Sequence, residues 1–351
     1  MTTLAAILLM VLQEPAKAGA PDKVDQAVAR GLKYFITAQN PAEGWISDTG
    51  ANRTSMTSLA ILAMAATGHQ PTDETPEGQT MKKALAYVLK PENQDAQGFL
   101  GGRDGSRMYG HGIATLMLSE MVGMGVDAQM DQLLRERCKK AVDLVLRSQS
   151  LQKDARNAGG WRYMPDSRDS DLSATVWQLM ALRSARNAGF DVPKEAITKA
   201  VEYVKRCYKA KRDAAGKADF SVKSACAYEP GQNPEYAMAA AGLLSLQVCG
   251  EYECPEVVGS ADWLKEKKID WNTEWFFYGT YYYAQGMFQR GGEYASHARK
   301  LVEEILLPKQ NPDGSWQGQH GQERGSGKVY CTAMGVLSLA VKYHFLPIYQ
   351  R

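Results

Sequence analysis

The feature that most constrains the fold of this chain is an internal repeat with a period of about 55 residues. Each copy contains an amphipathic segment, a turn that holds glycine and usually an aromatic residue, and a second segment that is apolar nearly all round. The apolar segments carry equivalent positions at Leu62, Leu116, Met180, Leu244 and Leu337. A single pair cannot bury its apolar surface alone, so the copies are expected to stack on one another.

The repeat predicts twelve helices in six pairs. The paired segments are residues 24–38 with 55–66, 81–89 with 113–122, 138–148 with 173–182, 197–208 with 236–248, 260–267 with 275–283, and 297–307 with 332–342. The apolar helix of each pair is expected inside and the amphipathic helix outside. Six pairs can close into a ring that needs no polar end repeats. We therefore expect an all-α fold, an α/α toroid (α6/α6 barrel), as a single domain over residues 24–343.

The stretch 158–182 combines the parts of this unit most completely. A glycine turn ends in Trp161, acidic residues that include Asp169 and Asp171 follow, and an apolar helix begins at about Ser173. Asp171 or Ser173 is placed to accept the free N–H groups of the first helical turn as an N-cap.

Charge and composition exclude some classes of partner. The formal net charge is +2, and no basic run carries interleaved aromatic residues, so a nucleic-acid partner is not expected. No apolar stretch approaches the roughly 20 residues that a membrane-spanning helix needs.

The N-terminus resembles an export signal. Leu4 to Leu12 is a short apolar run, and Ala16-Lys17-Ala18 fits an A-x-A cleavage pattern. Residues 1–18 are therefore expected to be a signal peptide of an exported protein. The first residues supply no Lys or Arg, so an N-terminal tail of a cytoplasmic protein is the alternative.

The cysteines do not form a recognisable scaffold. There are six, and none forms a C-x-x-C pair of the kind that marks zinc or redox sites. Cys249 and Cys254 are close enough in sequence to bridge a loop in an exported protein. Buried free thiols are the equal alternative.

Two motifs give the chain a resemblance to a known superfamily. Residues 310–316, QNPDGSW, resemble the QW motif of the prenyltransferase and squalene oxidase repeat superfamily, and residues 159–161, GGW, match a turn of the same family. The superfamily includes squalene–hopene cyclases, oxidosqualene cyclases and protein prenyltransferase β-subunits. The resemblance implies an α6/α6 barrel, in agreement with the repeat count.

The resemblance also suggests a catalytic residue. Class II terpene cyclases protonate an alkene with an Asp in a D-x-D-D-T-A segment, which matches residues 169–174 here. Asp169 and Asp171 match the first two acids, and Asp171 falls on the proton donor. Leu172 replaces the third acid and Ser173 replaces Thr, which removes a carboxylate that helps to poise the donor. Helix capping, residual acid catalysis and ligand binding all remain open for these two acids.

Two other activities of related toroids find no support in the motifs. His111 and Cys331 stand near the starts of apolar helices, but the D-x-C pair with a later His that prenyltransferases use for zinc is absent. We expect neither a metal nor a cofactor. A thioester is excluded because Tyr252 occupies the position of the glutamine that would condense with Cys249.

One end of the barrel is predicted to be a polar mouth above an aromatic lining. The positions nine residues before the helix landmarks are Arg53, Arg107, Asp171, Glu235 and Lys328, with Thr273 or Glu274 in the fifth repeat. These charges are expected to divide into a positive and a negative arc, or to pair with loop residues. The aromatic candidates for ligand contact are Tyr109, Trp161, Tyr163, Trp177, Trp275, Phe277 and Tyr281.

Three functions remain compatible with these features. The first is a terpene-cyclase-like enzyme in which Asp171 is the general acid on a polyprenyl substrate. The second is a non-catalytic exported module that binds a small molecule (an isoprenoid, sugar or peptide) or a protein. The third is an interaction scaffold with a filled barrel. The missing third acid and the length, about half that of a two-barrel triterpene cyclase, favour the second.

Overall fold

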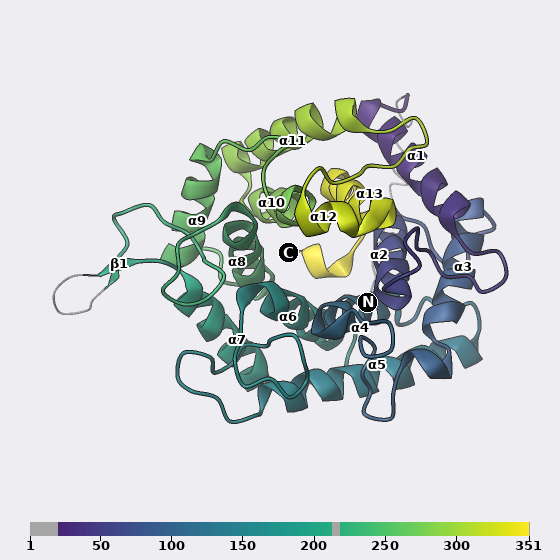
Figure 1. The fold of residues 1–351 in the computed structure, drawn as a ribbon, viewed down its shortest axis with the longest axis horizontal. Helices are drawn as coiled ribbons and strands as arrows, with labels where there is room; N and C mark the ends of the chain where they lie inside the picture. The colour runs from purple at the N-terminus through teal and green to yellow at the C-terminus, as the bar shows by residue number, and fades with distance from the viewer. Residues whose placement is uncertain (1–19, 213–217, 351) are drawn as a thin grey trace, which may run out of the picture.

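The computed structural model describes residues 20–212 and 218–350, and in this part of the chain six helices close an inner ring (Figure 1). The inner helices, in chain order, are α2 (Arg53–Ala66), α4 (Arg107–Met121), α6 (Leu172–Asn187), α8 (Tyr236–Val248), α10 (Phe276–Arg290) and α13 (Gly327–Leu339). Each packs on the next, and α13 packs on α2, which closes the ring.

Six further helices of the described chain surround this ring. They are α1 (Lys23–Ala38), α3 (Pro76–Val88), α5 (Ala128–Gln149), α7 (Lys194–Cys207), α9 (Pro255–Glu266) and α11 (Gly292–Leu306). The hydrophobic pattern explains the two layers. Helix α1 buries one face, with Val28, Leu32 and Phe35, whereas every residue of α8 is buried.

The predicted all-α toroid is confirmed, with some differences in detail. A short extra helix, α12 (Gly321–Gly325), lies in the connection between α11 and α13, in a segment for which no helix was predicted. The fifth outer helix begins at Pro255 rather than Ser260, and α10 continues from the aromatic block to Arg290. Strands β1 (Lys211–Arg212) and β2 (Ala218–Asp219) pair in an antiparallel arm that projects from the ring (Figure 1).

Two predictions concern membranes and the N-terminus. No helix among the described residues is long and apolar enough to cross a membrane. The predicted signal peptide, residues 1–18, lies outside the described residues.

Glycine turns join the outer and inner layers in four of the pairs. Gly44, Gly98, Gly159 and Gly314 have positive φ angles of 87°, 97°, 88° and 86°. A Cβ atom at these positions would lie 2.6, 2.3, 2.2 and 2.2 Å from a backbone carbonyl oxygen of a neighbouring outer helix. Only glycine allows both this backbone conformation and this approach.

A glutamine side chain fastens each of these turns. The amides of Gln39, Gln94, Gln149 and Gln310 each donate to the carbonyl of the turn glycine and to a carbonyl of the neighbouring outer helix, at 2.8–3.0 Å. The QW-like motif at 310–316 is therefore a structural clamp. The same clamp occurs in three earlier turns, although their sequences resemble the motif less.

The interior of the barrel is packed with side chains. Trp177, Tyr281 and Tyr282 are buried there, and the Trp177 and Tyr281 rings stack with centroids 5.7 Å apart. The 3-10 turn η4 (Pro347–Tyr349) enters the centre of the ring, where Tyr349 is buried against Tyr281 (Figure 1). Side chains of the described residues therefore occupy the centre of the barrel.

Candidate functional site

All six inner helices begin at the same end of the ring, because an outer helix returns the chain between each consecutive pair. We call this end the mouth. Asp171 lies there as the N-cap of α6, and its side chain is fully buried. Its Oδ1 accepts hydrogen bonds from the Ala174 N–H at 2.8 Å and from Ser173 Oγ at 2.5 Å. Of the two N-cap candidates at this helix, the structure therefore selects Asp171.

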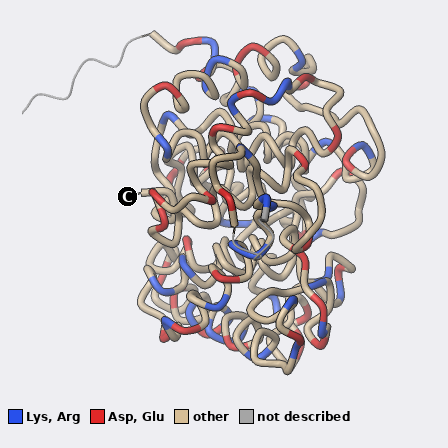
Figure 2. The backbone as a smooth tube through the Cα atoms, turned by 90° about the vertical axis from the view of Figure 1, so that its left-hand side faces the viewer, with Lys and Arg blue, Asp and Glu red and all other residues tan. Residues whose placement is uncertain are grey.

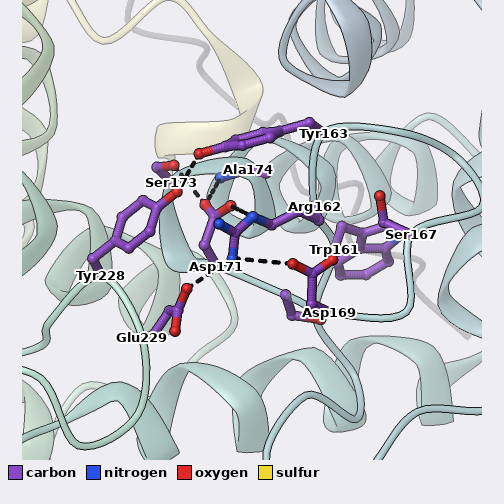
Figure 3. A network of polar contacts seen from close by, with 12 residues as sticks. Trp161, Arg162, Tyr163, Ser167, Asp169, Asp171, Ser173, Ala174, Tyr228 and Glu229 are labelled. Atoms are coloured by element: carbon purple, nitrogen blue, oxygen red, sulfur yellow. Dashed lines mark hydrogen bonds and ion pairs between the residues drawn. The ribbon is translucent and has the colours of Figure 1, made fainter.

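Arg162, which sequence reasoning missed, is the centre of the polar network at the mouth (Figure 3). Its Nε lies 3.1 Å from Asp171 Oδ2, and its guanidinium lies 2.7 Å from Glu229 and 3.4 Å from Asp169. The guanidinium also stands 4.9 Å from the centre of the Tyr163 ring. One cation is thus shared by three carboxylates and stacks against an aromatic face.

The environment of Asp171 acts on its pKa in two directions. Burial is the largest effect and raises the pKa above its usual value. Hydrogen bonds from Ser173 and Ala174 and the charge of Arg162 act against this rise without cancelling it. The carboxyl oxygens face protein groups, and the side chain is fully buried.

Tyrosine hydroxyls extend the network across the mouth. Tyr109 OH bonds with Ser173 Oγ, and Tyr163 OH bonds with Tyr228 OH. The Tyr109 and Tyr163 rings stack with centroids 5.6 Å apart, and Tyr278 OH donates to the Ser173 carbonyl at 2.9 Å. Burial raises the pKa of Tyr109 and Tyr228, so both remain neutral hydrogen-bonding groups.

The three cations that were predicted at the mouth, Arg53, Arg107 and Lys328, all lie there, but their environments differ. Arg53 begins α2, and its guanidinium lies 4.5 Å from the centre of the Trp45 ring. Arg107 begins α4 and is exposed. Lys328, near the start of α13, forms an ion pair of 2.9 Å with Asp313.

The predicted acids of the mouth also differ in their environments. Glu235 is the exposed N-cap position of α8, whereas Asp171 is buried and paired with Arg162. Figure 2 shows acidic and basic residues interspersed along the chain. Because Lys328 and Asp171 both have partners of opposite charge, the pairing alternative describes these two positions better than a divided field.

The predicted aromatic contacts separate into two groups. Trp161, Trp177, Phe277 and Tyr281 are each 1% exposed and belong to the packed core. Trp161, for example, donates from Nε1 to the Val145 carbonyl at 2.9 Å. Tyr109 and Tyr163 are half-buried at the mouth, and Trp275 is 37% exposed. A ligand that approaches from solvent meets the second group first.

A pocket of about 430 Å³ lies beside the mouth, between the start of α10 and α12, and we call it the α10–α12 pocket. Trp271, Trp275, Phe276 and Phe277 provide its aromatic lining. The polar lining consists of Asn272, Thr273, Glu274, Gln319, His320, Gln322 and Glu323, together with glycine backbone. Trp275 and Phe277 were predicted as ligand contacts, whereas the α12 side of the pocket was not foreseen.

Glu323 connects the two walls of this pocket. It is 5% exposed, and its Oε1 accepts a hydrogen bond from the Tyr278 N–H at 2.9 Å. It thereby caps α10 from outside, because Trp275 at the N-cap position provides no side-chain cap. Burial raises the pKa of Glu323 to about 7.

The residues considered for metals have structural partners. His111 is fully buried, with Nδ1 accepting from the Leu100 N–H at 3.2 Å and Nε2 donating to the Ala141 carbonyl at 3.1 Å. Cys331 is buried, and its sulfur accepts from the Gly318 N–H at 3.1 Å. Among residues 20–212 and 218–350, no group of three or more His, Cys, Asp and Glu is arranged to hold a metal ion. Cys249 and Cys254 are free thiols.

Sequence comparisons and structural comparisons give different results. No protein-family profile matches this sequence, and no curated protein matches it significantly. The structure is similar to an α-1,6-mannanase of Salegentibacter solved with α-1,6-mannotriose, at a TM-score of 0.57 and 10% identity over 92% of this chain and all of that one.

Two other solved structures have comparable similarity. A type II terpene cyclase from Scytonema aligns at a TM-score of 0.59 and 15% identity, covering 92% of this chain and 98% of that chain. A glycosidase aligns at 0.54 and 11% identity, covering 93% and 98%. At such low identities the shared property is the α/α toroid fold, which these proteins use for unrelated reactions.

Proposed function

We propose that this α/α toroid protein is a non-catalytic binding module that takes a small molecule in the α10–α12 pocket at its mouth. The observation that carries the proposal is the contrast between the two candidate sites. The pocket offers about 430 Å³ beside an indole that is 37% exposed, whereas the Asp171 side chain is fully buried. Concave sites with an aromatic lining and a few polar groups are the usual form of small-molecule sites.

The environment of Asp171 argues against alkene protonation. A proton donor must present its acid to the reacting carbon, but both Asp171 oxygens face protein groups, including Arg162 Nε at 3.1 Å. Leu172 occupies the position of the third acid in the cyclase segment. Below the network, Trp177, Tyr281 and Tyr349 occupy the interior that a polyprenyl chain would need.

The pocket offers two kinds of contact to a ligand. Trp275 and Trp271 provide aromatic surface on which an apolar face can stack. Asn272, Gln319 and His320 provide hydrogen-bonding groups at the opening of the pocket. This combination suits a molecule of modest size with one apolar face and polar edges.

Tryptophan fluorescence titrations test the proposal. The probes are α-1,6-mannotriose, geranylgeranyl dihydroxybenzoate, short peptides and small ammonium compounds. We expect one class to change the emission of the native protein and to lose at least about tenfold in affinity in Trp275→Ala, since truncating an aromatic hot spot costs about 2 kcal/mol or more and tenfold is about 1.4 kcal/mol. Phe345→Ala, which removes another exposed aromatic at 53% exposure, is the matched control and should bind normally.

Two results would contradict this function. One is ligand binding that Trp275→Ala leaves unchanged. The other is conversion of the polyprenyl probe by the native protein that disappears in Asp171→Asn, because catalysis through Asp171 would then be the function.

A further inference from the structure

The aromatic wall of the α10–α12 pocket has an unusual construction. The Trp271 ring centroid lies 5.2 Å from that of Phe276 and 5.3 Å from that of Phe277, so the buried phenyl groups pack against the indole. Trp275 has φ 54° and ψ 41°, a left-handed conformation that residues with side chains rarely adopt. This conformation holds a large apolar side chain at the opening, where burial does not reward it.

Glu274 is the carboxylate that faces solvent at the pocket, since Glu323 is buried and its pKa is raised to about 7. Among the described residues that line it, none is lysine or arginine, whereas Glu274 and Glu323 are both present. Glu274 is exposed, and no hydrogen bond or ion pair joins its side chain to the described residues. His320 is the one other lining residue that can carry a charge.

The positive end of α10 does not oppose this negative character. The N-terminus of a helix carries a partial positive charge of roughly half a unit. Glu323 already lies against it and accepts the Tyr278 N–H. The carboxylate of Glu274 therefore remains available to a ligand.

We infer that the α10–α12 pocket binds an organic cation, specifically an ammonium group carrying alkyl substituents. This inference rests on the proposed binding function and names the ligand class of that site. Indole faces attract cations more strongly than other aromatic side chains do, and alkylated ammonium groups are the ligands that aromatic cages typically select. Trp271 and Trp275 provide the faces, and Glu274 provides the opposite charge.

Choline and its neutral isostere 3,3-dimethylbutan-1-ol test the charge requirement. The two molecules have nearly the same shape, so only the cation distinguishes them. Titration calorimetry should show choline binding at least about fivefold more tightly than the isostere, with the difference decreasing at high salt. Equal binding of the two molecules would overturn the inference.

Two variants test the residues. Glu274→Gln should weaken choline binding about threefold or more and leave the isostere unchanged, whereas Trp275→Ala should weaken both. Glu235→Gln, an exposed glutamate at the mouth but outside the pocket, is the control and should bind choline as the native protein does. Circular dichroism verifies that each variant is folded.

The outcomes separate this inference from the proposed function. If a saccharide binds in a manner that depends on Trp275 and choline does not bind, the proposed binding function stands and the inferred ligand class, an organic cation, is wrong. If no class of small molecule shows binding that depends on Trp275, both are wrong. If Glu274→Gln leaves choline binding unchanged, the assigned counter-charge is wrong and the inference fails.

Discussion

At the scale of single residues, Asp171 shows how one side chain serves the fold and resembles a catalyst. Asp171 caps α6 and also forms an ion pair with Arg162. Arg162 in turn forms ion pairs with Glu229 and Asp169. Burial raises the pKa of Asp171, although its hydrogen bonds and the charge of Arg162 act against the rise. The match to the cyclase segment therefore follows from a helix start as readily as from acid catalysis.

The first prediction separates two contributions of Asp171 to stability, its role as the N-cap of α6 and its buried charge. Asp171→Asn keeps the acceptor for Ser173 and Ala174 and removes the buried charge, so the free energy of unfolding should change by less than about 0.5 kcal/mol. Asp171→Ala leaves those donors without an acceptor and should cost about 2 kcal/mol. Urea unfolding measures both. Asp127→Ala, at the exposed N-cap of α5, should cost only about 1 kcal/mol. An Asn variant as unstable as the Ala variant would instead show that the ion pair dominates.

At the scale of elements, the glycine turns hold the two helical layers together. Each of the four clamped turns combines a left-handed glycine, a close carbonyl contact and a bridging glutamine. The remaining connections differ, since α7 and α8 are joined through the β1–β2 arm and α9 and α10 through the loop that carries Trp271. One of the two connections that lack the glycine–glutamine clamp, the loop between α9 and α10, therefore also lines the α10–α12 pocket.

The second prediction compares two glycines with almost the same backbone conformation. Gly159 (φ 88°) has the Lys199 carbonyl oxygen 2.2 Å from where a Cβ would stand, whereas Gly189 (φ 86°) has nothing within 4 Å. Gly189→Ala should cost only the left-handed strain of about 1 kcal/mol. Gly159→Ala adds a backbone clash and should cost about 3 kcal/mol or more. Thermal and urea unfolding measure the difference, and equal costs would show that the outer helix simply moves away.

At the scale of the whole molecule, the chain closes its ring and fills it with its own C-terminal segment. Glu120, 4% exposed on α4, holds that segment by accepting from Ser184 Oγ at 2.5 Å and from the Ile348 N–H at 3.4 Å. Burial raises the pKa of Glu120 to about 7 from 4.5. The segment that contains Ile348 is therefore held by a carboxyl group whose pKa lies near neutral pH.

The third prediction follows from the direction of this pKa shift. The folded state holds the Glu120 proton more tightly than the unfolded state, so its contribution is fully present below about pH 4.5 and is lost as the pH rises through about 7. Glu120→Gln should be more stable than the native protein by about 2 kcal/mol at pH 8 and by much less at pH 5. Unfolding at both pH values measures this. Glu235→Gln, at an exposed glutamate of the mouth, is the matched control. A Glu120→Gln variant that loses stability equally at both pH values would contradict the prediction.

Local patterns in the sequence determined the architecture of this protein. Apolar residues recur at helical spacing, and glycine turns recur between helices, so each pair is readable within about 55 residues. In a closed ring, each of the six apolar inner helices is buried between its neighbours and no end repeat is left exposed. For this reason the toroid was predicted correctly. The mouth positions of Arg53, Arg107 and Lys328 could also be placed, because each stands at the start of the inner helix of its own repeat.

Only the tertiary structure decided what surrounds the candidate residues. Arg162 meets Glu229 across 67 positions, Glu323 caps α10 across 45, and Ile348 meets Glu120 across 228. No periodicity encodes such contacts, because they join loops and ends that belong to different repeats. They nevertheless decide that Asp171 is buried, that the barrel is filled, and that the accessible aromatic surface lies in the α10–α12 pocket. Local spacing specifies helices, whereas exposure and charge pairing depend on where distant segments meet.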